Sequence, residues 1–359
     1  MAPRWSSELR MAARHPMDLV TRGLISPEHA QKLTKVTERY EFLVSDYYLS
    51  LIDPSDPHCP IRKQAIPQIE ELHISSQEQL DPIGDERFSP TPILVHRYPD
   101  RALLFPTFRC PMFCRYCFRK DSLNQRSIKL HKDLPPTLEY LHAHPEIEEL
   151  ILSGGDPLML SNSKLEQLFQ VLKETPIQRI RLHTRFPVTL PQRIDIALCK
   201  ILHDSRPITV VTHFNHPKEV TAIAKEGLQR LKKAGVMVLN QSVLLKGIND
   251  HPDTLRTLCL RLVDQAVSPY YLHHPDLTQG TQHFRVSLNE GLSIMKKLKG
   301  SISGYALPRY VIDIPNGGGK IEINSDAAKE TEITGVWKLR SPINGEWQNY
   351  IDPAEYKRV

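Results

Sequence analysis

The sequence predicts an α/β fold in which six β–α units form an open, partial (β/α)6 barrel behind a helical N-terminal extension. From about residue 101 onward, short apolar runs alternate with amphipathic stretches of helical period, a pattern that builds a parallel sheet. The apolar runs are nearly continuous, as expected for parallel strands covered by helices. Six units are fewer than the eight of a closed barrel, so we expect an open barrel with its site at the carboxyl ends of the strands.

The elements follow in order along the chain. Residues 1–95 are rich in charge and proline, and the apolar spacing over residues 29–52 has a helical period. Strands are predicted at 102–108, 148–154, 178–184, 208–214, 235–242 and 269–274. Helices are predicted at 134–144, 163–174, 192–204, 219–234, 254–266 and 287–300. We therefore divide the chain into a helical N-terminal region (1–95), the barrel (96–300) and a C-terminal segment (301–359).

Composition excludes several classes of protein. With 359 residues, 40% of them hydrophobic, the chain can bury a sizeable core, which argues against disorder. The 46 basic and 41 acidic residues are interleaved, without the basic stripe typical of nucleic-acid binding. The first thirty residues lack a signal-peptide core, and no apolar stretch is long enough to span a membrane. We expect a cytoplasmic protein with neither nucleic acid nor membrane as a partner.

Three of the six cysteines lie directly after the first predicted strand. Cys110, Cys114 and Cys117 have C-x3-C-x2-C spacing, which in a reducing compartment indicates metal ligation rather than disulfides. Thiolates are the usual ligands of iron–sulfur clusters, and three of them leave one iron of a [4Fe–4S] cluster open. The alternatives are a chance grouping or a zinc site, but zinc usually takes four ligands and a fourth at matching spacing is missing. A simple iron–sulfur electron carrier is also disfavoured, because a complete set of four clustered cysteine ligands is missing.

This cysteine motif resembles that of radical S-adenosylmethionine (SAM) enzymes. The resemblance implies that the open iron binds the amino and carboxylate groups of SAM, whose reductive cleavage gives a 5′-deoxyadenosyl radical. Gly154, Gly155 and Asp156, after the second predicted strand, are similar to the SAM-binding segment of that superfamily. Glycine allows close approach of the backbone to a ligand, although alone this would be a common turn. Gln241 is also placed at SAM by the resemblance.

The resemblance narrows to the lysine 2,3-aminomutase family and covers nearly the whole chain. The segments that are similar to this family include 45–54, 59–64, 97–101, 212–217, 240–245 and 315–320. This resemblance implies a second cofactor, pyridoxal 5′-phosphate (PLP), carried as an aldimine on Lys320. Without it, Lys320 would be interpreted as an exposed lysine after a glycine-rich turn. Arg97, Tyr98 and Arg101 resemble residues near the PLP phosphate, a group that suits the fork of arginine.

The same resemblance implies how the substrate binds. Arg119 is similar to the residue that pairs with the substrate α-carboxylate. Asp276 and Asp313 are similar to the two carboxylates that hold the side-chain ammonium in lysine-specific members. Two carboxylates around one cation are favourable, whereas without a cation they repel each other. We therefore expect an isomerase that converts L-lysine into β-lysine by migration of the α-amino group.

Several alternatives remain open. The same chemistry on glutamate or arginine is one, and β-lysine production dedicated to elongation factor P is another, although that relative is expected to carry a different residue in place of Asp313. A radical SAM enzyme without PLP, in which Lys320 is structural, is a third. The chain lacks the cysteines that form a zinc site in fermentative members, so no zinc site is expected. A homo-oligomer is possible, and an electron donor such as flavodoxin or ferredoxin is the implied protein partner.

Overall fold

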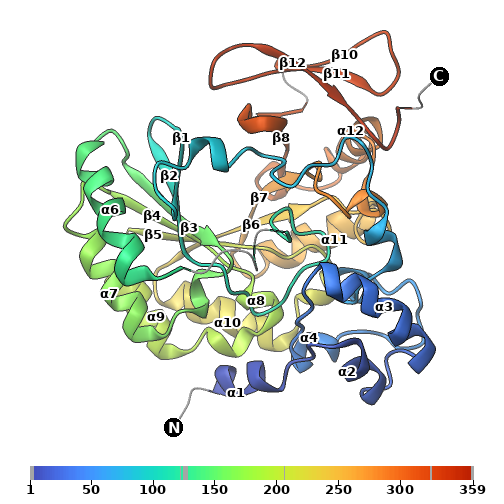
Figure 1. Ribbon diagram of the computed structural model, residues 1–359, viewed down its shortest axis with the longest axis horizontal. Helices are drawn as coiled ribbons and strands as arrows, with labels where there is room; N and C mark the ends of the chain where they lie inside the picture. The colour runs from blue at the N-terminus through green and yellow to red at the C-terminus, as the bar shows by residue number, and fades with distance from the viewer. Residues whose placement is uncertain (1–3, 122, 124–127, 206, 324–325, 357–359) are drawn as a thin grey trace.

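The computed structural model describes residues 4–121, 123, 128–205, 207–323 and 326–356. Its main feature is a nine-stranded sheet in which the strands are neighbours in chain order (Figure 1). Strands β2 to β8 are parallel, and β1 and β9 are antiparallel to their neighbours at the two ends. The strands are β1 (Leu94–Tyr98), β2 (Arg101–Thr107), β3 (Glu149–Gly154), β4 (Arg179–His183), β5 (Ile208–Thr212), β6 (Met237–Val243), β7 (Ser268–His273), β8 (Arg309–Ile314) and β9 (Gly319–Glu322).

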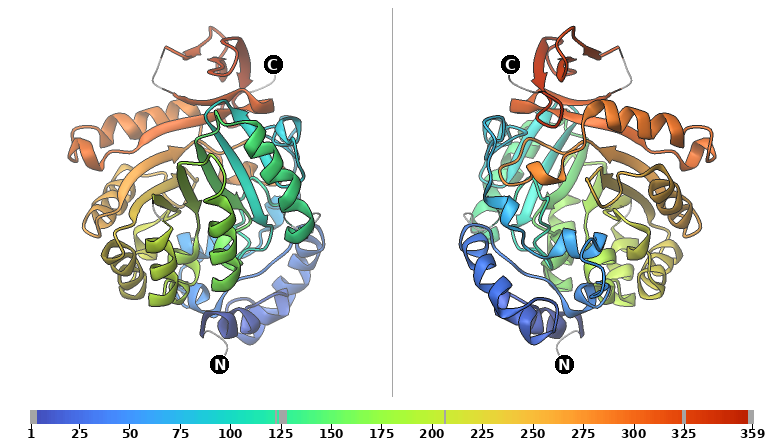
Figure 2. Two further views of the ribbon diagram at one scale, coloured as in Figure 1. Left: turned by 90° about the vertical axis from the view of Figure 1, so that its left-hand side faces the viewer. Right: turned by 90° about the vertical axis from the view of Figure 1, so that its right-hand side faces the viewer.

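The six predicted strands correspond to β2 through β7, and the predicted α/β partial barrel is confirmed. Helices follow these strands on the outer side of the sheet, as expected for right-handed parallel crossovers (Figure 2). They are α6 (Leu130–Ala143), α7 (Asn162–Leu172), α8 (Phe186–Thr189), α9 (Ile196–Asp204), α10 (Ala222–Lys233), α11 (Pro252–Val263) and α12 (Leu288–Leu298). Short 3-10 helices lie at Ile69–Leu72, Glu86–Phe88, Pro157–Met159, Pro191–Arg193, Pro217–Glu219, Gln282–Phe284, Gly304–Ala306 and Pro315–Gly317.

The sheet is longer than the sequence predicted. Strand β8 adds a seventh parallel strand, and β9 returns beside it as a hairpin in which Asp313 pairs with Lys320. These strands are short, and each carries a charged residue in its interior. The usual apolar strand pattern is therefore missing. The Gly-rich turn between them lies close to the cavity described below.

The N-terminal helices are α1 (Arg4–Met11), α2 (Pro16–Thr21), α3 (Pro27–Arg39), α4 (Asp46–Leu49) and α5 (Pro60–Ala65). The helical period over 29–52 is divided between α3 and α4, because α3 ends at Arg39 and the chain becomes extended at Tyr40. Val44 then forms a β-bridge with Ala13, and the Ser45 side chain caps α4 by accepting a hydrogen bond from the Tyr48 N–H. Local capping and tertiary pairing therefore override the helical period.

The N-terminal region shares its apolar core with the barrel. The Trp5 ring of α1 contacts the Phe186 ring of α8 edge-to-face, with centroids 5.7 Å apart. At the opposite end of the molecule, a separate antiparallel sheet is formed by β10 (Ala328–Glu330), β11 (Val336–Arg340) and β12 (Trp347–Ile351) (Figure 1). Its buried side chains, such as Trp337, join Ile312 of β8 in a second core. No helix among the described residues is long and apolar enough to cross a membrane.

Candidate active site

A cavity of about 680 Å³, large enough for a cofactor and a small substrate, lies at the carboxyl ends of the parallel strands. The loops after β2, β3, β4 and β7 contribute to its wall, together with residues of β8 and β9. Every residue that the sequence placed in the site lines this one cavity: Arg97, Tyr98, Arg101, Cys110, Cys114, Cys117, Arg119, Gly154, Gly155, Asp156, Gln241, Asp276, Asp313 and Lys320.

The cysteine loop is fixed to the N-terminal region by buried contacts. The Arg115 N–H donates to the Gln64 carbonyl (3.0 Å), and the Arg115 guanidinium donates to the fully buried Glu71 carboxylate (2.9 Å). Lys120 donates to the same carboxylate at 2.8 Å. Burial opposes ionisation of Glu71, but Arg115 and Lys120 outweigh it and hold its pKa below the usual value. A buried ion-pair network thus supports the loop.

The three thiols share a confined space. Burial, followed by repulsion from the neighbouring thiols, raises the pKa of Cys117 to about 11 and that of Cys110 well above its ordinary value. Within the described part of the chain, no three His, Cys, Asp or Glu side chains already have the spacing of a metal site. Three thiols that repel each other suit a cationic iron cluster, whose irons stabilise thiolates. The donor set therefore fits a [4Fe–4S] cluster.

The glycine turn after β3 packs against the backbone that leads into the cysteine loop. Gly154 has a φ of +99°, and a Cβ at Gly155 would lie 2.4 Å from the Arg109 carbonyl oxygen, so no larger residue fits. The Asp156 carboxylate is buried and accepts hydrogen bonds from the Leu158 N–H, the Thr184 hydroxyl and the Arg185 N–H (2.8–3.0 Å). Its side chain therefore holds β3 and β4 together, while the backbone of the turn lines the cavity.

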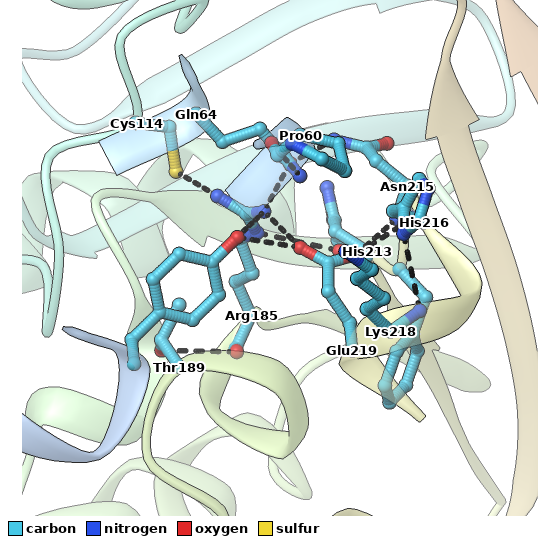
Figure 3. Close-up of polar contacts among 12 residues, drawn as sticks. Pro60, Gln64, Cys114, Arg185, Thr189, His213, Asn215, His216, Lys218 and Glu219 are labelled. Atoms are coloured by element: carbon cyan, nitrogen blue, oxygen red, sulfur yellow. Dashed lines mark hydrogen bonds and ion pairs between the residues drawn. The ribbon is translucent and has the colours of Figure 1, made fainter. Parts of the chain in front are cut away.

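Arg185, which follows β4, is a site residue that sequence reasoning missed (Figure 3). Its guanidinium donates to the Cys114 sulfur (2.7 Å), the Gln64 side-chain oxygen (2.7 Å) and the Glu219 carboxylate (2.9 Å). Glu219 is fully buried and also accepts from the Asn215 N–H at 2.6 Å. Four segments distant in sequence thus fix one cation beside a cluster thiol. The available signal was a charged residue directly after the predicted strand 178–184.

Lys320 lies on β9, opposite Asp313 of β8. Its amine contacts the Asp313 carboxylate and lies 3.3 Å from His273 Nδ1. Its backbone N–H donates to the Tyr98 hydroxyl at 2.7 Å, and the Arg101 guanidinium stacks 3.8 Å from the Tyr98 ring centroid. Although burial opposes it, the Lys320 ammonium holds the pKa of Asp313 well below its usual range. The structure thus brings together four predicted residues from four strands.

Asp276 stands on the loop after β7. Arg285 donates to the backbone carbonyls of Pro275 (2.9 Å) and Asp276, which fixes this loop. Burial, followed by repulsion from Asp313, raises the pKa of Asp276 to about 7. Among the described residues, the Asp276 carboxylate accepts no hydrogen bond that would compensate its charge. A bound cation would stabilise its ionised form.

Arg97 and Arg119 meet at a carboxylate that the sequence did not reveal. Asp85 accepts from Arg119 Nη2 at 2.6 Å through one oxygen and from Arg97 Nη2 at 2.9 Å through the other. The Arg119 guanidinium also stacks on the Phe118 ring, 4.3 Å from its centroid. Asp85 lies in a loop 34 residues before Arg119, and no local motif marked it.

Buried imidazoles complete the cavity wall. The Gln241 side-chain nitrogen lies 3.2 Å from His213 Nε2, and burial lowers the pKa of His213 to about 3. Burial also lowers the pKa values of His183 and His273. Nε2 of His183 and Nε2 of His273 are buried without a hydrogen-bond partner among the described residues. Neutral imidazoles of this kind are available to a bound ligand.

Comparisons with known proteins agree with this geometry. Residues 104–258 match the radical SAM superfamily, and residues 295–330 match the lysine-2,3-aminomutase family. Over 321 residues the chain is 41% identical to an L-lysine 2,3-aminomutase from Fusobacterium nucleatum, which covers 89% of this chain and 76% of that protein. The chain belongs to the lysine 2,3-aminomutase family of radical SAM enzymes. It is therefore an aminomutase, an isomerase acting on an amino acid, and its superfamily implies a [4Fe–4S] cluster and SAM.

Identity within this family does not fix the substrate. The chain is also 39% identical over 298 residues to a glutamate 2,3-aminomutase from Clostridioides difficile, covering 82% of this chain and 70% of that protein. Among solved structures, the chain is similar to a radical SAM methyltransferase from Sphaerobacter thermophilus, with a TM-score of 0.46, 15% sequence identity, and coverage of 61% of this chain and 68% of that one. Because relatives named for lysine and for glutamate are about equally similar to this chain, the substrate has to be argued from the charges of the cavity.

Proposed function

We propose that this aminomutase acts on L-lysine, carries PLP on Lys320 and produces β-lysine by moving the α-amino group to C3. The observation that carries the proposal is that two acids, Asp276 and Asp313, line the cavity that also contains Lys320 and lie close enough for their charges to repel each other. When bound, the cluster and SAM supply a carbon-centred radical, and PLP supplies a conjugated π system through which nitrogen migrates.

The residues around Lys320 fit PLP. An amine that forms a covalent bond to an aldehyde must first lose its proton. His273, whose Nδ1 lies 3.3 Å from the amine, is kept neutral by burial and by the nearby Lys320 charge, so it places no second cation against the lysine. Tyr98 fixes the backbone of Lys320. Arg101, stacked on Tyr98, provides a guanidinium for a phosphate group.

The charges of the cavity favour a basic substrate. Burial and repulsion from Asp313 raise the pKa of Asp276, and a lysine side-chain ammonium would stabilise its ionised form. A glutamate side chain would instead bring a third carboxylate beside Asp276 and Asp313, and like charges in a buried site are strongly unfavourable. We assign Arg119 to the α-carboxylate of the substrate, since a guanidinium binds that group through paired hydrogen bonds.

The test is the identity of the product. Protein reconstituted anaerobically with iron, sulfide and PLP is incubated with SAM, dithionite and either lysine, arginine or glutamate, and the products are identified by mass spectrometry. We expect β-lysine from lysine and little conversion of glutamate. Arginine is the informative competitor because it also offers a cation to the two acids. A preference for glutamate would overturn the proposed substrate while leaving the family assignment unchanged.

A further inference from the structure

We propose that Asp85 is a positioning residue. It orients the Arg119 guanidinium toward the substrate carboxylate and links that guanidinium to the hairpin that bears Lys320. The inference rests on the proposed function in one respect, the assignment of Arg119 to the α-carboxylate. Asp85 belongs to the segment Asp81–Phe88, called here the 81–88 segment, which precedes β1 and was not part of the predicted site.

The contacts of Asp85 join two separate elements. Arg97 comes from β1 and Arg119 from the cysteine loop, and each donates to a different oxygen of the Asp85 carboxylate, at 2.9 and 2.6 Å. The side chains of Asp85, Arg97 and Arg119 are only 10%, 8% and 11% exposed. Water therefore screens these charges poorly, and the hydrogen bonds are charge-assisted.

The 81–88 segment is also packed against the turn that leads to Lys320. A Cβ added to Gly84, whose φ is +67°, would lie 2.8 Å from the carbonyl carbon of Asn316 and from the nitrogen of Gly317. The Asn316 N–H donates to the Pro82 carbonyl at 3.2 Å. A Cβ on Gly317 would lie 2.2 Å from the Phe88 ring. The segment and the turn therefore fit together without space between them, and only glycine is accommodated on each side.

The packing of the 81–88 segment against the Lys320 turn gives the Asp85 carboxylate a role in positioning. The substrate must bind at Lys320 while its carbon skeleton lies within reach of the radical generated at the cysteine loop. Asp85 is carried by a segment locked to the Lys320 turn, and it holds an arginine that follows the last cysteine by two positions. The hydrogen bond from Arg119 to Asp85 therefore sets the distance between the two halves of the site. Small errors in such positioning reduce reaction rates greatly.

The test measures binding in the absence of turnover. Lysine is titrated into PLP-loaded protein without SAM or reductant, and the change in PLP absorbance gives its Kd; lysinamide, which lacks the carboxylate, is titrated in parallel. For Asp85→Asn we expect the Kd of lysine to rise about 10-fold or more and that of lysinamide to change less than about 3-fold. Asp85→Glu, which keeps the charge, should recover part of the lysine affinity. Tighter binding of lysine by Asp85→Asn would overturn the proposal, because it would make Asp85 a competitor of the substrate.

Two controls separate this inference from its alternatives. Glu86→Gln alters the next, exposed residue of the same segment and should leave both Kd values unchanged; equal losses in Glu86→Gln and Asp85→Asn would overturn the proposal. Arg119→Lys should lose lysine affinity, and adding Asp85→Asn to it should cost little more, because both changes remove one interaction. Fully additive losses would contradict action through Arg119. A wild-type protein that binds lysine and lysinamide equally would instead refute the role of Arg119 in the proposed function.

Discussion

Replacement of Asp276 with asparagine is expected to weaken lysine binding and to remove part of its pH dependence. Burial and the neighbouring Asp313 raise the pKa of Asp276 to about 7, whereas the lysine side chain stays protonated throughout the neutral range. The affinity for lysine should therefore increase as the pH rises and this carboxyl group ionises. Lys320, Arg285 and Arg119 lower this pKa.

The magnitude follows from the ionised fraction. For a carboxyl group with a pKa of about 7, that fraction rises roughly tenfold between pH 6 and pH 8. The contribution of Asp276 to lysine binding should increase by about the same factor. Charge-assisted hydrogen bonds contribute about 1.5–3 kcal/mol. At ~1.4 kcal/mol per decade, Asp276→Asn should therefore raise the Kd about 10- to 100-fold at pH 8, and by a smaller factor at pH 6, where the wild-type carboxyl group is mostly protonated.

The assay is the lysine titration of the PLP-loaded protein at pH 6, 7 and 8. The α-amino group of lysine also titrates, but it is common to both proteins, so the ratio of their Kd values isolates Asp276. Asp264→Asn is the matched control, because Asp264 is an exposed aspartate at the end of α11. A Kd ratio between variant and wild type that does not change from pH 6 to pH 8 would refute the reasoning.

Three further substitutions test other parts of the site. Cys114→Ala should lose the cluster and all turnover while the fold is kept, which iron and sulfide analysis after anaerobic reconstitution will measure; a full cluster in this variant would contradict the ligand assignment. Lys320→Ala should still cleave SAM under strong reduction but lose PLP trapped by borohydride, whereas retention of trapped PLP would place it on another lysine. Glu71→Gln breaks a buried ion network and should destabilise the protein by about 3 kcal/mol or more in urea unfolding near pH 7, with the exposed Glu70→Gln as control. Because the folded-state pKa of Glu71 is lowered, this difference should shrink as the pH falls below about 4.5, and a difference independent of pH would argue against the ion network.

The barrel was predictable because its strands carry the strongest local signal in the chain. Strands β3 and β5, for example, place runs such as Glu149–Gly154 and Ile208–Thr212 between helices of clear period, and both were located within two residues. Strand β8 was not found because Asp313 interrupts its apolar pattern, although the chemistry of the site requires that acid. The helical period over residues 29–52 did not reveal the break between α3 and α4, because capping by Ser45 is a local signal that periodicity alone does not detect.

The candidate site was found where a motif or a family resemblance marked it, and was missed where tertiary contacts create it. The cysteines and the glycine turn are compact signals after predicted strands. Asp85 and Glu219 are different, because each belongs to the site only through a hydrogen bond from an arginine more than thirty residues away in the sequence. Asp156 was expected to face a ligand, yet its carboxylate is engaged by three protein donors. Which way a side chain turns cannot be read from spacing.

The hairpin of β8 and β9 bears on how enzymes of this kind can change their substrate. Because Asp313 and Lys320 are a cross-strand pair, a slip of one residue in the ladder would turn one of them to the other face of the sheet. An insertion or deletion in the intervening turn would therefore separate cofactor attachment from cation binding, so the hairpin is expected to be kept as one unit. Asp276 stands on a loop outside any strand register and can be exchanged on its own. Divergence toward a new amino acid, in nature or by engineering, is expected to begin at Asp276, with the hairpin as the part that stays constant.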